Sequence, residues 1–130
     1  MILIIGGACQ GKVAFARKLS GMEEEPFACC QADGLTDGLE KAFGKRFLTG
    51  FHGWVRQIVE AGGDPEEFVR QILKSDPELV TMDEVGCGIV PVEPLERNYR
   101  EAVGHAGQLL AQKAGQVYRV TCGIPVRIKG

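Results

Sequence analysis

Three observations in the sequence predict a three-layer α/β domain with a mostly parallel sheet. Segments with the pattern of strands alternate with segments with the pattern of helices along the chain. The first strand candidate, Met1 to Ile5, is a continuous apolar run bounded by Gly6, which is typical of a parallel strand buried on both faces. After a turn at Gly123, we expect Val126 to Lys129 to return as an antiparallel edge strand, where lysine is tolerated.

Length and composition limit the class of protein. The 130 residues, 45% hydrophobic and 25% charged, are expected to form one nucleotide-binding domain over residues 1–130. A net charge of −2 gives no general attraction to nucleic acid or anionic membranes. The apolar run Ile2 to Ile5 is too short to span a membrane, so we expect a cytoplasmic protein. Five cysteines without CxxC spacing predict neither a disulfide framework nor a zinc site.

The first half of the chain contains five further candidate helices and strands. The polar segment Glu23 to Pro26 is expected to be a loop, and the helix before it closes at Ser20-Gly21. The spacing of Trp54, Val55, Ile58 and Val59 predicts one buried helical face. The elements expected before that face are a helix over Lys12 to Leu19, a weaker strand over Phe27 to Cys30, a short helix over Leu35 to Phe43 and a strand over Arg46 to Phe51.

The clearest helix start is Asp64-Pro65. It combines a capping carboxylate with a proline at the first helical position, and two glutamates follow at the positive end of the helix dipole. The remaining elements are a strand over Glu78 to Met82, a long helix from Pro94 or Leu95 to about Ala114, and a strand over Val117 to Cys122.

A phosphate-binding loop is predicted between the first strand and the first helix. Glycines at this point let backbone N–H groups converge on phosphate oxygens, and Lys12 can reach the terminal phosphates. The alternative is a glycine-rich turn with a solvated lysine. The residues expected to bind the nucleotide, ATP or GTP, are Gly6, Gly7, Ala8, Cys9, Gln10, Gly11, Lys12 and Val13.

Val13 stands where a phosphate loop usually places a hydroxyl that holds Mg²⁺. A valine side chain offers no oxygen ligand. We therefore expect Mg²⁺ binding to be weakened, with the metal held by water and acids elsewhere or bound poorly. The sequence assigns no metal ligand.

The segment "VTMDEVGCGIVP", residues 80 to 91, begins with a strand that ends in two carboxylates at the ligand-binding edge of the sheet, and a glycine-bounded loop follows. Asp83 and Glu84 are candidate catalytic residues, suited to positioning a metal or accepting a proton from an attacking hydroxyl. The alternative is that one of them caps a helix or forms an ion pair.

The same segment resembles the "DEVG-GIVP" signature of the adenosylcobinamide kinase / adenosylcobinamide-phosphate guanylyltransferase family of cobalamin biosynthesis. The segments "GGACQGK", "RNYREAVGHAGQLLA" and "VTCGIPVRIK" follow the family's order. The resemblance implies a RecA-like P-loop domain that phosphorylates the aminopropanol hydroxyl of a cobinamide-like corrinoid. It also implies a guanylylated histidine that then passes on GMP, and assembly as a trimer.

The chain departs from the family pattern between Gly21 and Gly62, where the family's nucleotide-accepting histidine segment is not found. Val13 replaces a serine, and Gly107 replaces an asparagine. The resemblance with these departures implies an adenosylcobinamide kinase-like protein in which guanylyl transfer is lost or altered. The alternative is a homologue that binds nucleotide or corrinoid without catalysis.

His52 stands at a strand-to-helix junction on the ligand edge and is a further candidate. It could act as a base, as a metal or phosphate contact, or as a displaced guanylyl acceptor. The alternative is a partly buried histidine hydrogen-bonded near a helix start. The resemblance also favours substrate or phosphate contacts from Gly86, Gly88, Arg97 and Arg100, although the two arginines could equally form a solvated helix face.

Overall fold

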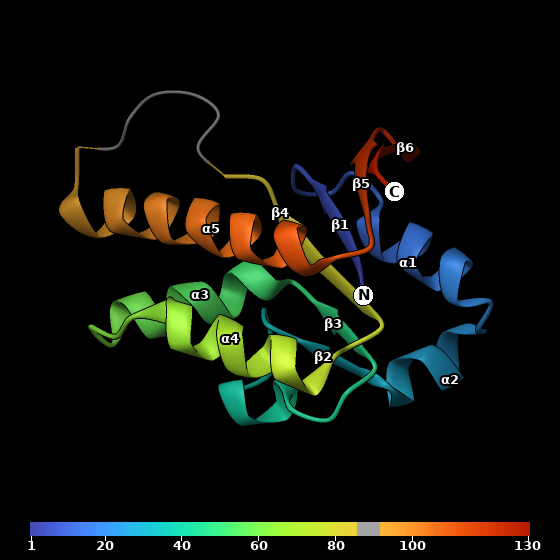
Figure 1. Ribbon diagram of the computed structural model, residues 1–130, viewed down its shortest axis with the longest axis horizontal. Coiled ribbons are helices and arrows are strands. Elements are labelled where there is room, and N and C mark those ends of the chain that lie inside the picture. The colour runs from blue at the N-terminus through green and yellow to red at the C-terminus, as the bar shows by residue number, and fades with distance from the viewer. Residues whose placement is uncertain (86–91) are drawn as a thin grey trace.

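The computed structural model describes residues 1–85 and 92–130 and confirms the α/β class (Figure 1). The elements of the first half are β1 (Ile2–Gly6), α1 (Lys12–Ser20), α2 (Glu24–Cys29), β2 (Gln31–Asp33), a 3₁₀ helix η1 (Leu39–Ala42), β3 (Phe47–Thr49) and α3 (Phe51–Glu60). Those of the second half are α4 (Pro65–Ser75), β4 (Leu79–Asp83), α5 (Pro94–Lys113), β5 (Gln116–Thr121) and β6 (Ile124–Lys129).

The six strands form one sheet in the order β2-β3-β4-β1-β5-β6. The first five strands in this order are parallel to their neighbours, and β6 pairs with β5 in the antiparallel sense. β1 therefore lies between β4 and β5, and the carboxyl ends of β1 to β5 meet at one edge. Ligands bind at this edge in open α/β sheets.

Helices cover both faces of the sheet, which gives the three layers (Figure 1). On one face, α3, α4 and α5 pack with a core that contains Trp54, Phe68 and Leu110. On the other face, α1 and α2 cover a smaller core in which the rings of Phe27 and Phe47 stack at 4.4 Å between centroids. The sheet is thus buried on both sides, as the apolar run of β1 predicted.

The predicted start of α4 is confirmed in its details. The side chain of Asp64 accepts a hydrogen bond from the N–H of Glu66 at 3.0 Å, and Pro65 is the first helical residue. The cap satisfies one of the N–H groups that a helix start leaves without a partner.

The prediction of a strand over Phe27 to Cys30 is wrong, as is the loop expected over Glu23 to Pro26. Glu24–Cys29 forms α2, and the strand β2 follows it at Gln31–Asp33. Two glutamates occupy the first turn of α2, where carboxylates suit the positive end of the dipole. The segment needs only one buried face, which Phe27 supplies.

Two further boundaries differ from the prediction. Within Leu35 to Phe43 only the short 3₁₀ helix forms, because aspartate side chains tie down the preceding backbone: Asp33 accepts the N–H of Leu35, and Asp37 accepts the N–H of Asp33. The strand expected over Arg46 to Phe51 ends at Thr49, since Gly50 adopts a left-handed φ of 59° that begins α3.

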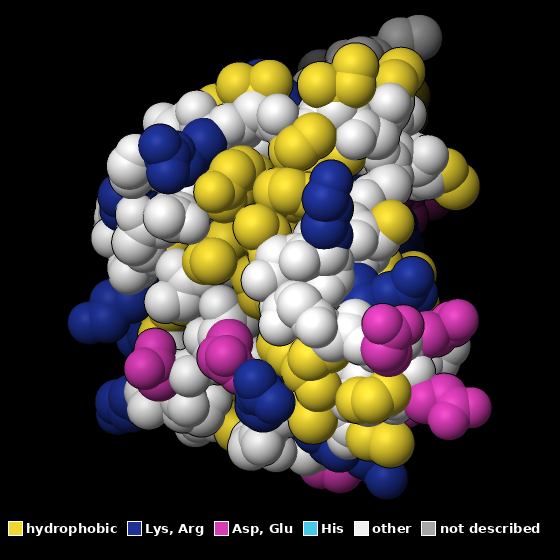
Figure 2. Space-filling view, turned by 90° about the vertical axis from the view of Figure 1, so that its right-hand side faces the viewer, with side chains coloured by type: hydrophobic (Ala, Val, Ile, Leu, Met, Phe, Trp, Pro, Cys, Tyr) yellow, Lys and Arg dark blue, Asp and Glu magenta, His cyan; other side chains and the backbone are white. Residues whose placement is uncertain are grey.

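β6 is an edge strand, as predicted, and starts at Ile124 rather than at Val126. It exposes Ile124, Val126 and Ile128 at 65%, 57% and 53% of their surface. Figure 2 views the side of the molecule where α1, β5 and β6 lie and shows hydrophobic side chains gathered on it. None of the described helices is both long and apolar enough to cross a membrane.

Candidate functional site

The predicted phosphate loop lies between the end of β1 and the start of α1. Gly11 precedes α1 with a φ of 94°, and Cys9 has a φ of 58°, so the loop turns through two left-handed residues. In the described part of the chain, no side chain caps the start of α1. Its first N–H groups are therefore available to an anionic ligand.

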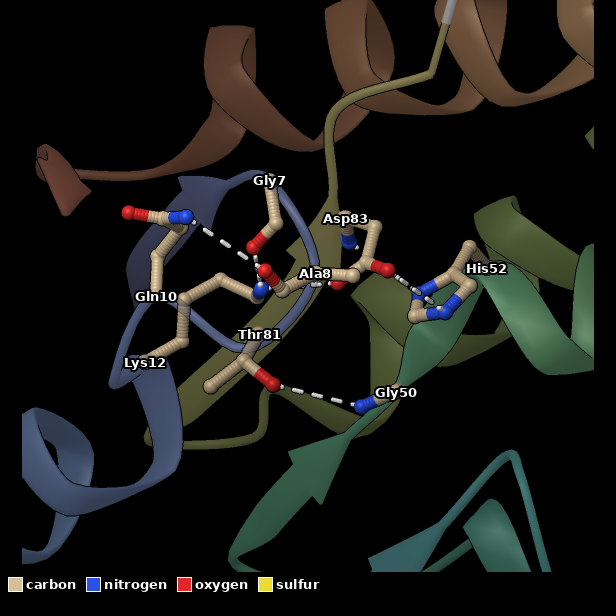
Figure 3. A network of polar contacts seen from close by, with 8 residues as sticks. All are labelled: Gly7, Ala8, Gln10, Lys12, Gly50, His52, Thr81 and Asp83. Carbon is tan, nitrogen blue, oxygen red and sulfur yellow. Dashed lines mark hydrogen bonds and ion pairs between the residues drawn. The ribbon is translucent and has the colours of Figure 1, made fainter. Parts of the chain in front are cut away.

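Lys12 is buried beneath this loop, with 8% of its surface exposed. Its Nζ donates a hydrogen bond to the carbonyl oxygen of Gly7 at 2.6 Å and lies 2.7 Å from Oδ1 of Asp83 (Figure 3). The alternative of a solvated lysine is therefore wrong. The ammonium group is held at the centre of the loop by one carbonyl and one carboxylate.

Asp83 ends β4 opposite Gly6 in the parallel register, which explains its position beside the loop. His52, from the first turn of α3, contacts it on the other side (Figure 3). Nδ1 of His52 accepts the backbone N–H of Asp83 at 3.0 Å, and Nε2 lies 3.4 Å from Oδ2 of the carboxylate. Both ring nitrogens therefore face Asp83.

The pKa of His52 is lowered from its usual value because burial disfavours the charged ring, although the charge of Asp83 opposes this shift. Since Nδ1 accepts a hydrogen bond, the neutral ring carries its proton on Nε2, which lies 3.4 Å from Oδ2 of the carboxylate. Neither nitrogen offers a free lone pair in this arrangement. The partly buried, hydrogen-bonded histidine considered from the sequence matches this geometry.

A cleft of about 270 Å³ opens between the phosphate loop and the carboxyl ends of β2, β3 and β4. Its lining includes three residues that the sequence reasoning missed: Asp33, Thr49 and Thr81. Thr81 accepts the N–H of Gly50 at 3.2 Å and so ties β4 to the start of α3. These residues could have been found from their positions at the ends of strands. Asp33 was missed because the second strand was predicted at Phe27 to Cys30 and not at Gln31–Asp33.

The side chain of Glu84 points in a different direction from that of Asp83, because successive side chains along a strand point to opposite faces of the sheet. Its backbone N–H donates to the carbonyl of Gly6 at 2.8 Å. Its carboxylate accepts hydrogen bonds from Nε and Nη2 of Arg119 at 2.7 and 3.2 Å. Glu84 does not line the cleft, in agreement with the ion-pair alternative for one of the two acids.

Among the remaining candidates, the structure describes only the two arginines of α5, and it does not bring them to the cleft. Arg97 is exposed and Arg100 half-buried on α5, and neither belongs to the lining of the cleft. Gly86 and Gly88 lie outside the described residues. The contacts expected from these four residues stay predictions.

Residues around the loop provide little for a metal ion. Residues 1–85 and 92–130 contain no cluster of three or more His, Cys, Asp or Glu side chains that could hold one. Val13 has no oxygen, and 42% of its surface is exposed beside the loop. Asp83 is the one carboxylate of the described residues that contacts Lys12, so Mg²⁺ fits here only if phosphates and water complete its six oxygen ligands.

A substitution at Gly6 is expected to distort the loop. A Cβ atom at this position would lie 2.5 Å from the carbonyl oxygen of Val120, a backbone atom that cannot rotate away. We expect Gly6→Ala to lower the free energy of unfolding by about 1–3 kcal/mol, the range for overpacking. Chemical denaturation measures this change. Gly7→Ala is the matched control, because its Cβ would meet only Cγ of Gln10 at 3.6 Å; an equal loss in both variants would contradict the prediction.

Comparisons with known proteins agree with this fold. The family model for cobinamide kinase / cobinamide phosphate guanyltransferase matches residues 44–128, which include β4, α5 and the β5–β6 hairpin. The phosphate loop precedes the matched region, so its assignment depends on its own sequence and geometry.

Two curated relatives carry the name bifunctional adenosylcobalamin biosynthesis protein CobU. The protein of Escherichia coli K12 and that of Salmonella typhimurium LT2 are each 49% identical to this chain over 51 residues. The aligned stretch covers 39% of this chain and only 28% of each relative. Because the family model spans well over half of the sequence, the chain belongs to the cobinamide kinase / cobinamide phosphate guanyltransferase family.

Proposed function

We propose that this protein acts in adenosylcobalamin biosynthesis as a nucleotide-dependent kinase of a cobinamide-like corrinoid. The observation that carries the proposal is the contact of 2.7 Å between Lys12 and Asp83 beneath the phosphate loop. Phosphoryl transfer needs a cation and a proton acceptor beside the terminal phosphate of ATP or GTP, and this pair supports that role for the loop. Family membership supplies the acceptor, a corrinoid hydroxyl.

The phosphate loop and three side chains of the cleft each have a distinct part in this reaction. Backbone N–H groups of the loop and the start of α1 bind the phosphates, and Lys12 exchanges the carbonyl of Gly7 for a phosphate oxygen. The corrinoid hydroxyl oxygen forms a bond to the terminal phosphorus as the bond to the nucleoside diphosphate breaks. Asp83 takes the proton of that hydroxyl. His52 keeps the carboxylate turned towards Lys12.

The direct test is an incubation of the purified protein with adenosylcobinamide, Mg²⁺ and either ATP or GTP. Mass spectrometry of the corrinoid should show the addition of one phosphate with at least one of the two nucleotides. If nucleotide binds but the corrinoid stays unmodified with both, the kinase proposal is wrong.

The exposed Val13 favours a second candidate, a homologue that binds nucleotide without turnover. Both candidate functions bind the nucleotide in the same cleft. They differ in whether a metal ion supports turnover. Mg²⁺, when bound, would neutralise phosphate charge, with phosphates and water supplying most of its oxygen ligands.

We expect nucleotide affinity to depend weakly on Mg²⁺ in the wild-type protein and more strongly in Val13→Ser, because serine restores an oxygen ligand to the loop. Calorimetric titrations with ATP, with and without Mg²⁺, measure both dependences. Val13→Ala is the control, since it shortens the side chain without adding an oxygen. Full magnesium-dependent turnover in the wild-type protein would show that Val13 does not disable the site.

Guanylyl transfer through a histidine is expected to be absent. The sequence has two histidines, and one of them, His105, is exposed on α5 near Glu66. The other, His52, has both nitrogens directed at Asp83. A histidine must attack phosphorus with a free lone pair.

We therefore expect no stable histidine–GMP adduct after incubation with radiolabelled GTP, while unmodified nucleotide binds. Acid-labile, base-stable labelling of the protein would report an adduct. Labelling that disappears in His52→Ala, and persists in His105→Ala, would overturn the expectation and identify a relocated guanylyl acceptor.

A further inference from the structure

The turn between β5 and β6 lies against the phosphate loop. Thr121 pairs with Ile124, so Cys122 and Gly123 form a two-residue hairpin turn. Both have positive φ, 51° and 75°, as type I′ hairpin turns require. The N–H groups of these two central residues lie outside the hairpin ladder and need acceptors elsewhere.

A single residue of the phosphate loop supplies both acceptors. Oε1 of Gln10 accepts the N–H of Cys122 at 2.6 Å, and the backbone carbonyl of Gln10 accepts the N–H of Gly123 at 2.9 Å. The side-chain oxygen of Gln10 is therefore committed to the hairpin. Two donors of Gln10 remain to serve a phosphate: its backbone N–H and its side-chain Nε2, which donates to the carbonyl of Ala8 at 3.5 Å.

Both ends of the loop also pack on this hairpin. Gly6 approaches the carbonyl of Val120 so closely that a Cβ would lie 2.5 Å from it. A Cβ at Gly11 would lie 3.4 Å from Cα of Gly123. The loop is thus supported at its start, middle and end by residues 120 to 123, which directly follow the part of β5 that pairs with β1.

The conformation of the loop explains why such support matters. Cys9, directly before Gln10, has a left-handed φ of 58°, which non-glycine residues rarely adopt. Strained backbone of this kind persists when its surroundings determine it fully. The two hydrogen bonds of Gln10 fix the residue that follows Cys9.

We propose that Gln10 is a positioning residue, through which the Cys122-Gly123 turn holds the phosphate loop in its phosphate-binding conformation. The proposal rests on nucleotide binding at this loop, as in the proposed function, and does not require phosphoryl transfer. As a consequence, nucleotide binding at the loop should change the environment of the Cys122 amide in the hairpin, which is far from Gln10 in sequence.

The test uses Gln10→Leu, which keeps the size of the side chain and removes the acceptor. We expect the dissociation constant for ATP, measured by calorimetry, to rise about 2- to 10-fold, as the loss of one hydrogen bond gives. By NMR, the Cys122 amide should be protected from hydrogen exchange in the wild-type protein and should shift when ATP is added. Both properties should be lost in Gln10→Leu.

Two further variants separate positioning from a general loss of stability. Gln116→Leu removes a glutamine at the far end of the same hairpin, and it should leave ATP affinity and the Cys122 amide unchanged. Gln10→Glu keeps an acceptor and should keep the amide protected. Wild-type ATP affinity in Gln10→Leu, or an unprotected Cys122 amide in the wild-type protein, would overturn the proposal.

The outcomes also distinguish this proposal from the proposed function. A wild-type protein that binds ATP with the expected amide response, and phosphorylates no corrinoid, supports the role of Gln10 and contradicts the kinase. A wild-type protein that binds neither ATP nor GTP contradicts both.

Discussion

The Asp83→Asn variant is expected to phosphorylate the corrinoid about 10²- to 10⁴-fold more slowly than the wild-type protein, the usual contribution of a general base. Asparagine has the same shape but cannot take the proton of the attacking hydroxyl. It keeps the backbone N–H that His52 accepts, so the geometry of the cleft is preserved. The rate of phosphocorrinoid formation at saturating nucleotide measures the effect.

Glu84→Gln is the matched control for this change. It removes a carboxylate from the adjacent residue, where the side chain pairs with Arg119 outside the cleft. We expect this variant to keep a rate close to that of the wild-type protein. A large loss in Glu84→Gln together with an active Asp83→Asn would assign the base to Glu84, as the sequence alone allowed.

The second large effect is expected from Lys12→Ala, which should weaken ATP binding by about 1.5–3 kcal/mol, the range for a hydrogen bond to a charged group. The variant removes the buried ammonium group, and it also leaves the Asp83 carboxylate without that partner beside the phosphates. The loss of a positive charge and the unpaired negative charge of Asp83 both disfavour the binding of an anionic phosphate.

Calorimetry with ATP measures this loss, and Lys18→Ala is the control. Lys18 lies on the same helix but is exposed in its last turn, so its removal should change the affinity little. Unchanged affinity in Lys12→Ala would show that the nucleotide phosphates do not bind at this loop.

The fold was predictable wherever a local signal and the tertiary contacts agree. The apolar run of β1, bounded by glycine, and the cap at Asp64 are strong local signals, and both elements were predicted correctly. The segment from Phe27 to Cys30 has no such signal, since a single buried phenylalanine suits a strand or a short helix equally. Packing against Phe47 decides between them, and that contact cannot be read from the sequence.

In the candidate site, too, features with a local sequence signal were predicted, and features that depend on tertiary contacts were not. The loop, Lys12 and Asp83 were predicted from strand ends and spacing, and the structure brings them together. The opposite directions of Asp83 and Glu84 depend on where β4 ends, which sequence patterns place only approximately. The bond between Gln10 and Cys122 joins residues 112 positions apart, so no local pattern could predict it.

The most direct measurement is a crystal structure with a non-hydrolysable ATP or GTP analogue. We expect phosphates within hydrogen-bonding distance of the N–H groups of the loop from Gly7 to Val13. We also expect Nζ of Lys12 to leave the carbonyl of Gly7 and to contact a phosphate oxygen. An analogue bound elsewhere, with the hydrogen bond between Lys12 and Gly7 unchanged, would contradict nucleotide binding at this loop.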